Sequence, residues 1–127
     1  MKNNISTIKN ALIYLFSFAF VYIGFRHFTD AQFFLHIMPD YLPWHLELVY
    51  LSGFLEITLG LLILFDQTRK MAAWGLILLL IAVFPANIYL VQSEEAQQAL
   101  DITREMSILR LPFQLVFITV AYWFTKD

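Results

Sequence analysis

The stretch HLELVYLSGFLEITLGLLILF, residues 45–65, decides the fold, because beyond its first turn it is apolar except for one carboxylate, Glu56. As an α-helix it would rise about 1.5 Å per residue, enough to cross a hydrocarbon core of roughly 30 Å. Glu56 would then lie near mid-membrane, where a charged side chain costs about 2.5–3.5 kcal/mol on the insertion scale. Gly53 and Gly60 fall on the same helical face. We therefore expect this face to pack closely inside a helix bundle and to carry the charge there.

The composition is that of a membrane protein. Hydrophobic residues make up 60% of the 127-residue chain and charged residues 14%, against about 25% charged in soluble domains. No linker, low-complexity segment or internal repeat divides the chain, so we predict a single domain over residues 1–127. The predicted fold class is all-α, an integral membrane bundle of four transmembrane helices, with an interfacial segment between helices one and two and a short helix between helices three and four. The expected spans are residues 9–28, 45–65, 71–91 and 107–124.

The connections between these spans have the character of surface structure. Residues 29–44, TDAQFFLHIMPDYLPW, contain two prolines and no Lys or Arg, and their aromatic side chains suit the membrane interface. The short basic connection DQTRK, residues 66–70, makes helices two and three antiparallel neighbours. Ser93 followed by Glu94 and Glu95 is an N-cap with acids in the first turn, which predicts a short helix over residues 94–105 outside the hydrocarbon.

The distribution of Lys and Arg predicts the orientation. The apolar run near the N-terminus continues past the small residues of a weak cleavage site, so we expect it to remain as the first of four spans. Four crossings place both termini on one side. The basic residues of that side are Lys2, Lys9, Arg69, Lys70 and Lys126, and those of the other side are Arg26, Arg104 and Arg110. Because cytoplasmic segments carry the excess of basic residues, we expect a multi-pass protein of the bacterial inner (plasma) membrane with both termini cytoplasmic.

This topology gathers polar residues of all four helices toward the outer end. We predict an outward-facing polar pocket that ends at the carboxylate of Glu56. Its candidate ligand-binding residues are Arg26, His27, Glu56, Asn87, Arg110 and Gln114. Two arginines and a histidine with one carboxylate make a net positive pocket, suited to a small anion or a quinone-like head group. The arginines would orient this ligand, and His27 or Glu56 would exchange protons with it.

A structural interpretation of the same residues is left open. In it, Arg26 or Arg110 pairs with Glu56, and nothing binds. Pro85 removes a backbone hydrogen bond of the third helix and should loosen it near Ile81. The two amide side chains of the pocket would satisfy the carbonyl that is freed there, and such polar contacts would fix the register of the helices.

A metal site is a third interpretation. His27, His36 and His45, with Glu47 or Glu56, are ligand types that suit zinc or iron. However, the histidines are nine residues apart, which is not a ligand spacing on one helix. We therefore predict no metal-binding residues.

Several stretches resemble the DoxX-like family of small bacterial four-helix membrane proteins. They are GFRHF (24–28), FFLHIMPDYLPWH (33–45), LVYLSGFLEITLG (48–60), AAWGLILLLIAVFPANIYL (72–90) and RLPFQ (110–114). The resemblance covers nearly the whole chain and implies a four-helix membrane bundle. It also implies an association with terminal-oxidase or thiosulfate:quinone oxidoreductase systems, or with oxidative-stress and thiol-handling proteins. The chain has no cysteine, which argues against a direct thiol role.

The resulting prediction is an accessory protein or subunit of a membrane redox or small-molecule-handling system. Its partners would be the lipid bilayer and one of a redox-complex protein, a quinone or a small anion. The chain could also form homo-oligomers. It has no basic run that would bind nucleic acid. The sequence requires no cofactor, although a quinone would fit. The alternatives are a structural or assembly protein without a ligand, and a small transporter acting as an oligomer. We expect no stand-alone catalysis and no catalytic residues, because no nucleophile and base lie at a recognisable spacing.

Overall fold

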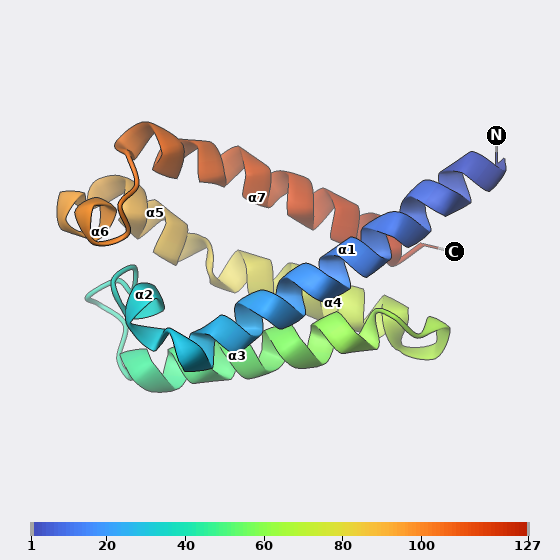
Figure 1. Ribbon diagram of the computed structural model, residues 1–127, viewed down its shortest axis with the longest axis horizontal. Coiled ribbons are helices and arrows are strands. Elements are labelled where there is room, and N and C mark those ends of the chain that lie inside the picture. The colour runs from blue at the N-terminus through green and yellow to red at the C-terminus, as the bar shows by residue number, and fades with distance from the viewer. Residues whose placement is uncertain (1, 127) are drawn as a thin grey trace.

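The computed structural model describes residues 2–126, and throughout this range every regular element is an α-helix (Figure 1). The helices are α1 (Lys2–Thr29), α2 (Ala31–Leu35), α3 (His45–Leu62), α4 (Asp66–Ala82), α5 (Phe84–Gln92), α6 (Glu94–Ala99) and α7 (Arg104–Phe124). Four helical segments are long and apolar enough to cross a membrane: Asn4–Thr29, His45–Leu62, Asp66–Gln92 and Arg104–Phe124. The predicted all-α fold class with four spans is therefore confirmed, with α2 and α6 as the short helices between spans.

Some helix bounds differ from the predicted ones. The third span begins at Asp66 rather than at residue 71, so most of the predicted connection forms the first turn of α4. Side chains of that turn explain the tight corner, because Thr68 donates a hydrogen bond to Leu62 O (2.6 Å) and Arg69 Nε donates one to Ile63 O (2.8 Å). These bonds satisfy carbonyls that the end of α3 leaves without helical partners. The helix between the third and fourth spans is also shorter than the predicted 94–105.

The break between α4 and α5 follows from Pro85, which stands in the first turn of α5. Proline lacks a backbone N–H and its ring clashes with the carbonyl four residues earlier. The helix is interrupted at Val83, between Ala82 and Phe84, close to the predicted position near Ile81. Together α4 and α5 form one bent span.

The helices pack in a sequence rather than around a common axis. α1 lies along α3, α3 against α4, and α4 with α5 against α7. α1 and α7 meet near the two chain termini and separate toward the other end (Figure 1). At their meeting point the ring of Phe16 makes edge contacts with Phe117 and Phe124, at centroid distances of 5.9 and 5.1 Å. The apolar core thus fills the half of the bundle near the termini and leaves α1 and α7 apart in the other half.

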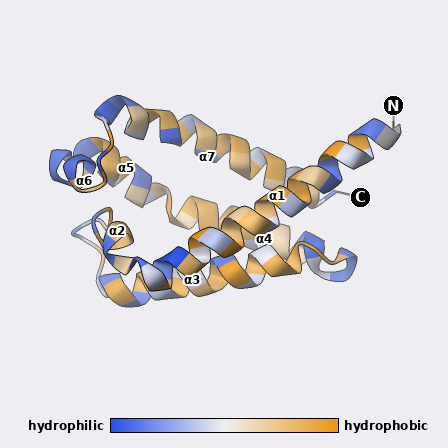
Figure 2. Ribbon diagram, in the orientation of Figure 1, coloured by the Kyte–Doolittle hydropathy of each residue, from blue (hydrophilic) through white to orange (hydrophobic). Residues whose placement is uncertain are grey.

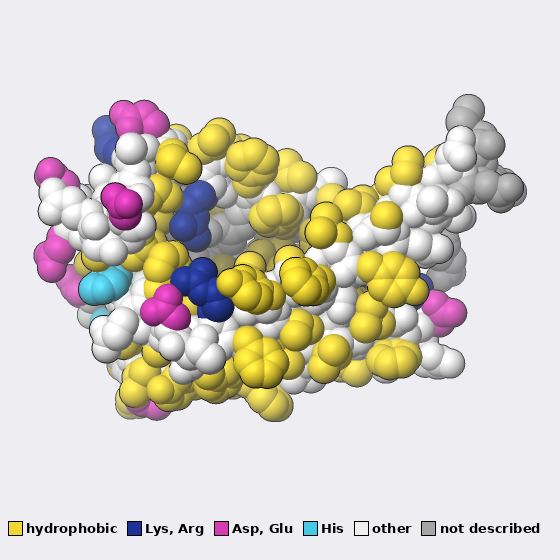
Figure 3. Space-filling view, viewed as in Figure 1, with side chains coloured by type: hydrophobic (Ala, Val, Ile, Leu, Met, Phe, Trp, Pro, Cys, Tyr) yellow, Lys and Arg dark blue, Asp and Glu magenta, His cyan; other side chains and the backbone are white. Residues whose placement is uncertain are grey.

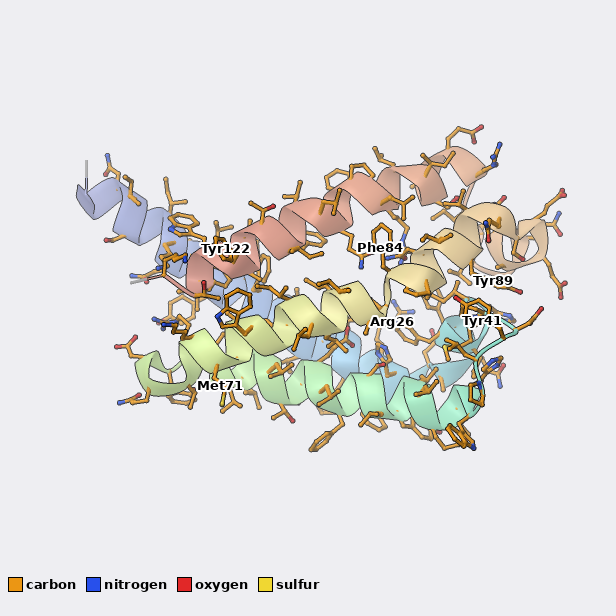
Figure 4. All side chains as sticks on the ribbon, turned by 180° about the vertical axis from the view of Figure 1, so that it is seen from behind. Arg26, Tyr41, Met71, Phe84, Tyr89 and Tyr122 are labelled. Atoms are coloured by element: carbon orange, nitrogen blue, oxygen red, sulfur yellow. The ribbon has the colours of Figure 1, made fainter. Side chains whose placement is uncertain are left out.

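The outer surface has the polarity of a protein surrounded by lipid. Along the long helices it is mostly apolar, and hydrophilic residues gather at the two ends (Figure 2). Large side chains such as Phe18, Leu78 and Leu115 are 72, 67 and 57% exposed, as expected of residues that face acyl chains. Figure 4 places Tyr122 near the termini and Tyr41 with Tyr89 at the opposite end. Tyrosines at both ends suit the two membrane interfaces.

Candidate functional site

A close contact between α1 and α3 positions the central carboxylate. A Cβ atom added to Gly53 would lie 2.8 Å from Gly24 O and 2.6 Å from His27 Cβ, and one added to Gly24 would lie 2.7 Å from Gly53 O. The two backbones can approach this closely because neither residue has a side chain. This contact brings His27 of α1 over the face of α3 that carries Glu56.

His27 is the partner of Glu56. Its Nδ1 atom lies 3.2 Å from Glu56 Oε2, and the two side chains are 8 and 12% exposed. The Nδ1–H is directed at Ile23 O, 2.8 Å away, and donates to it, so Oε2 receives no hydrogen bond from the described residues. The imidazole stacks on Phe34 of α2 at a centroid distance of 3.8 Å. The carboxylate oxygen Glu56 Oε2 is therefore buried beside the Nδ1–H of His27, which already donates its hydrogen bond to Ile23 O.

The structural interpretation, in which an arginine pairs with Glu56, is wrong for the described residues. Arg26 Nη2 instead donates to Asp30 Oδ2 at 2.8 Å, one turn along α1. Its guanidinium lies over the ring of Phe33 at 4.7 Å. The physical reason is helical geometry, because adjacent residues on a helix point about 100° apart. When His27 faces α3, Arg26 must face elsewhere.

Two amide side chains form a second polar group, between α5 and α7. Asn87 Nδ2 donates to Gln114 Oε1, and Gln114 Nε2 donates to Leu80 O. Leu80 lies just before the break in the third span, so its carbonyl is one of those left without a helical donor. The predicted use of both amides on the carbonyl freed by Pro85 is therefore met only in part, because Gln114 bonds Leu80 O, one residue before Ile81, and Asn87 bonds Gln114. Gln114 is 3% exposed, and this network leaves it little capacity for a ligand.

Arg110 is the one candidate without a partner. It is half-buried within the apolar fourth span, on the same face of α7 as Gln114 one turn later. No hydrogen bond, ion pair or ring contact joins it to any described residue. An unpaired charge at such a position is costly.

The surface near Arg110 is hollowed. Figure 3 shows a hollow between α7 and the end of α1, with Lys or Arg side chains on both sides of it. Arg26 near the end of α1 and Arg110 of α7 are the basic residues within the spans at this end, whereas Arg104 stands exposed at the very start of α7. Phe84, at the break of the third span, points toward α7 (Figure 4). A site here would thus have cationic walls and an aromatic neighbour.

The predicted pocket residues therefore divide into separate groups. His27 and Glu56 form a pair, Asn87 and Gln114 form a network, Arg26 is held by Asp30, and Arg110 has no partner among the described residues. The described residues contain no group of three or more His, Cys, Asp or Glu that could hold a metal ion. In the metal interpretation, His45 would be a ligand, yet its Nε2–H donates to Pro39 O at 3.1 Å.

Sequence reasoning missed two local partners and one cavity. The spacing of Arg26 and Asp30, four residues apart, could have revealed the ion pair, whereas the stacking of Phe34 on His27 depends on how α2 folds back. The cavity, of about 380 Å³, lies between the ends of α1, α4 and α7 near the termini. In the sequence, the clustering of basic residues on that side indicates the orientation in the membrane and does not by itself reveal a cavity.

Comparison with known proteins gives one family. A family model described as a domain of unknown function, DUF8561, matches residues 16–125. The match begins within the first span and includes the other three spans and every candidate residue above. No curated protein and no solved structure matches the chain.

Proposed function

This chain belongs to the DUF8561 family, and we propose that this small multi-pass membrane protein binds an anionic or carbonyl-bearing small molecule in the hollow between α1 and α7. In this proposal it serves as an accessory protein or subunit of a membrane redox or small-molecule-handling system. The resemblance to the DoxX-like family, whose members are associated with quinone-linked systems, supports the same role. The proposed orientation has both termini cytoplasmic and the hollow open outward.

The observation that carries the proposal is the unpaired Arg110. Every other polar candidate has a protein partner at hydrogen-bond or contact distance, but this guanidinium has none among the described residues. A guanidinium presents several N–H donors in a fixed fork, which matches a carboxylate, a phosphate or a quinone carbonyl. A ligand that completed this fork would offset the cost of the charge.

In this proposal the His27–Glu56 pair, between α1 and α3, supplies the groups that exchange protons. Glu56 Oε2 is buried and receives no hydrogen bond from the described residues, so a proton taken up by this carboxylate would meet no competing donor. His27 Nε2 is not used by the bond from Nδ1 to Ile23 O. Chemistry that couples proton uptake to a carbonyl-bearing ligand, as with a quinone head group, is compatible with these two groups.

A structural role in assembling a larger membrane complex is the second candidate. The network of Asn87, Gln114 and Leu80 O favours it, because this network fixes α7 against the bent span without any ligand. Such contacts in membrane proteins contribute about 0.6 kcal/mol on average, enough to set helix register. This role requires no free cation, and it therefore leaves Arg110 unexplained.

The test is native mass spectrometry of the protein extracted gently from its own membrane. Wild type is compared with Arg110→Gln and Glu56→Gln, which remove the charges and keep hydrogen-bonding side chains. Arg104→Gln is the matched control, because Arg104 is exposed at the start of α7 and lies outside the proposed site. Each variant is first checked for helix content and a monodisperse elution profile.

Retention of one small molecule by wild type and Arg104→Gln, with loss in Arg110→Gln, would support the proposal and name the ligand class. If all forms retain the same molecule, Arg110 does not bind it and the proposal fails. Retention of a partner protein by all forms, with no small molecule, would favour the assembly role.

A further inference from the structure

A second charged site lies at the opposite end of the bundle. The cavity of about 380 Å³ there is formed by the first part of α1, the start of α4 and the end of α7. The charged residues of its lining are Lys9, Asp66, Arg69, Lys70 and Lys126. Four of these residues are basic and one is acidic, so the formal charge of the lining is 4 − 1 = +3. This cavity shares no residue with the hollow between α1 and α7.

The basic residues of the cavity differ in how they are held. Arg69 belongs to the protein framework, because it donates to Ile63 O, to Leu64 O (3.2 Å) and to Asp66 Oδ1 (2.8 Å). Its bond to Asp66 also occupies the one acidic side chain of the lining. The remaining positive charge is therefore carried by three lysines.

Those three lysines have donors to spare. Lys9 Nζ donates once, to Lys126 O at 2.6 Å, and lies 5.9 Å from the centre of the Trp123 ring. Lys126 Nζ lies over Tyr122 at 4.5 Å. Lys70 is exposed and makes no hydrogen bond or ion pair with any described residue. An ammonium group has three donors, so an anion in the cavity could receive bonds from all three lysines.

The position of the cavity indicates the kind of anion. It lies where three of the four spans end, with Tyr122 and Trp123 beside it, which is the level of the lipid head groups. Phe65 and Met71 are next to the lining residues Asp66 and Lys70 in the chain, are 57 and 64% exposed, and offer an apolar surface. Basic cavities between transmembrane helices at this level bind phosphate-bearing head groups. A free phosphate would use the lysines alone, whereas a phospholipid would use both surfaces.

We propose that this cavity binds the phosphodiester head group of an anionic phospholipid, held by Lys9, Lys70 and Lys126, with its acyl chains along the exposed apolar side chains of the bundle. Such a lipid would join α1 to α4 and α7 at the end of the bundle. The start of α4 at Asp66 adds the partial positive charge of a helix N-terminus to the same cavity.

The experiment measures lipid binding by native mass spectrometry of the purified full chain in a mild detergent. The protein is titrated separately with phosphatidylglycerol, with phosphatidylcholine and with inorganic phosphate. The variant is Lys70→Gln combined with Lys126→Gln, both exposed positions whose replacement leaves the core untouched. The control is Arg104→Gln, which removes an equivalent charge at the other end. Elution profile and helix content are recorded for every form.

Wild type and Arg104→Gln should bind phosphatidylglycerol in preference to phosphatidylcholine. The double variant should bind phosphatidylglycerol about 25-fold more weakly. Each basic residue contributes about 1 kcal/mol to binding, which corresponds to a factor of about five in affinity for each of the two lysines. Equal binding of the two lipids by wild type would overturn the proposal. So would an unchanged affinity in the double variant, or displacement of phosphatidylglycerol by inorganic phosphate at equal concentration, which would identify a soluble phosphate as the ligand.

Discussion

Replacing Gly53 with alanine tests the contact that positions His27 and Glu56. The new methyl group would lie 2.6 Å from His27 Cβ, 2.8 Å from Gly24 O and 3.1 Å from His27 Cγ. Real Cβ atoms do not lie this close to backbone atoms, so α1 and α3 would have to separate. Overpacking of this kind costs about 1–3 kcal/mol, more than the gain of about 1 kcal/mol that alanine brings in helix propensity at most.

Gly60→Ala on the same face of α3 is the matched control. Its added Cβ would lie 3.2 Å from Phe20 Cβ and Val21 Cγ2 and 3.3 Å from Ser17 O, distances that a shift of a few tenths of an ångström relieves. We expect Gly60→Ala to stay within about 1 kcal/mol of wild type. The assay is unfolding in mixed micelles with increasing denaturing detergent, followed by tryptophan fluorescence. If Gly53→Ala were as stable as Gly60→Ala, the helices would not be in the close contact on which the site geometry depends.

Three further substitutions test individual interactions in the same unfolding assay. Arg69→Leu should lower stability by about 2–4 kcal/mol because it leaves Ile63 O and Leu64 O without donors, and Arg69→Lys should recover only part of the loss; full stability of the leucine variant would refute this role. Gln114→Leu should lower the free energy of unfolding by about 1–2 kcal/mol, because it leaves Leu80 O without its donor. Asn87→Leu should lower stability less when it is added to Gln114→Leu than when it is made alone. Additive losses of stability would argue against the network. Glu56→Gln should unfold at the same or a higher detergent fraction than wild type, since Oε2 receives no hydrogen bond; a clear loss of stability would make Glu56 a structural residue.

The fold could be predicted because a membrane span is recognisable from the composition of one continuous stretch of sequence. Each span is a long apolar run, and the break in the third span follows from Pro85 within two residues of the expected place. The start of α4 was missed because DQTRK is polar, and polarity alone does not show that Thr68 and Arg69 turn back to bond the carbonyls at the end of α3.

The sequence indicates which polar residues lie in the apolar spans, but it does not indicate which of them pair. Polar residues in apolar helices are easily recognised in the sequence. Which of them contact one another depends on how each helix is rotated and on where two helix backbones come close together, and no single stretch of sequence determines this. The contact of Gly24 with Gly53 selects His27 over Arg26 as the neighbour of Glu56. Where α1 and α7 separate, Arg110 has no partner among residues 2–126, and this separation is a property of the assembled bundle.

The central claim is that Arg110 lines a hollow that opens to water on the side away from the termini. The chain has no cysteine, so single cysteines can be placed at position 110 and at two controls without background. Ile108 is 44% exposed on the other side of the same helix, facing lipid, and Arg104 is exposed at the helix start. A thiol reacts as its thiolate, which does not form in hydrocarbon.

The measurement is the rate of labelling of these variants in intact cells by a charged, membrane-impermeant thiosulfonate. We predict that Arg110→Cys is labelled at a rate close to that of Arg104→Cys and that Ile108→Cys is not labelled, although it lies nearer the membrane surface. Failure of Arg110→Cys to react, with Arg104→Cys labelled, would contradict the existence of a water-accessible site at Arg110. Labelling of either arginine position only after the cells are opened would contradict the outward orientation.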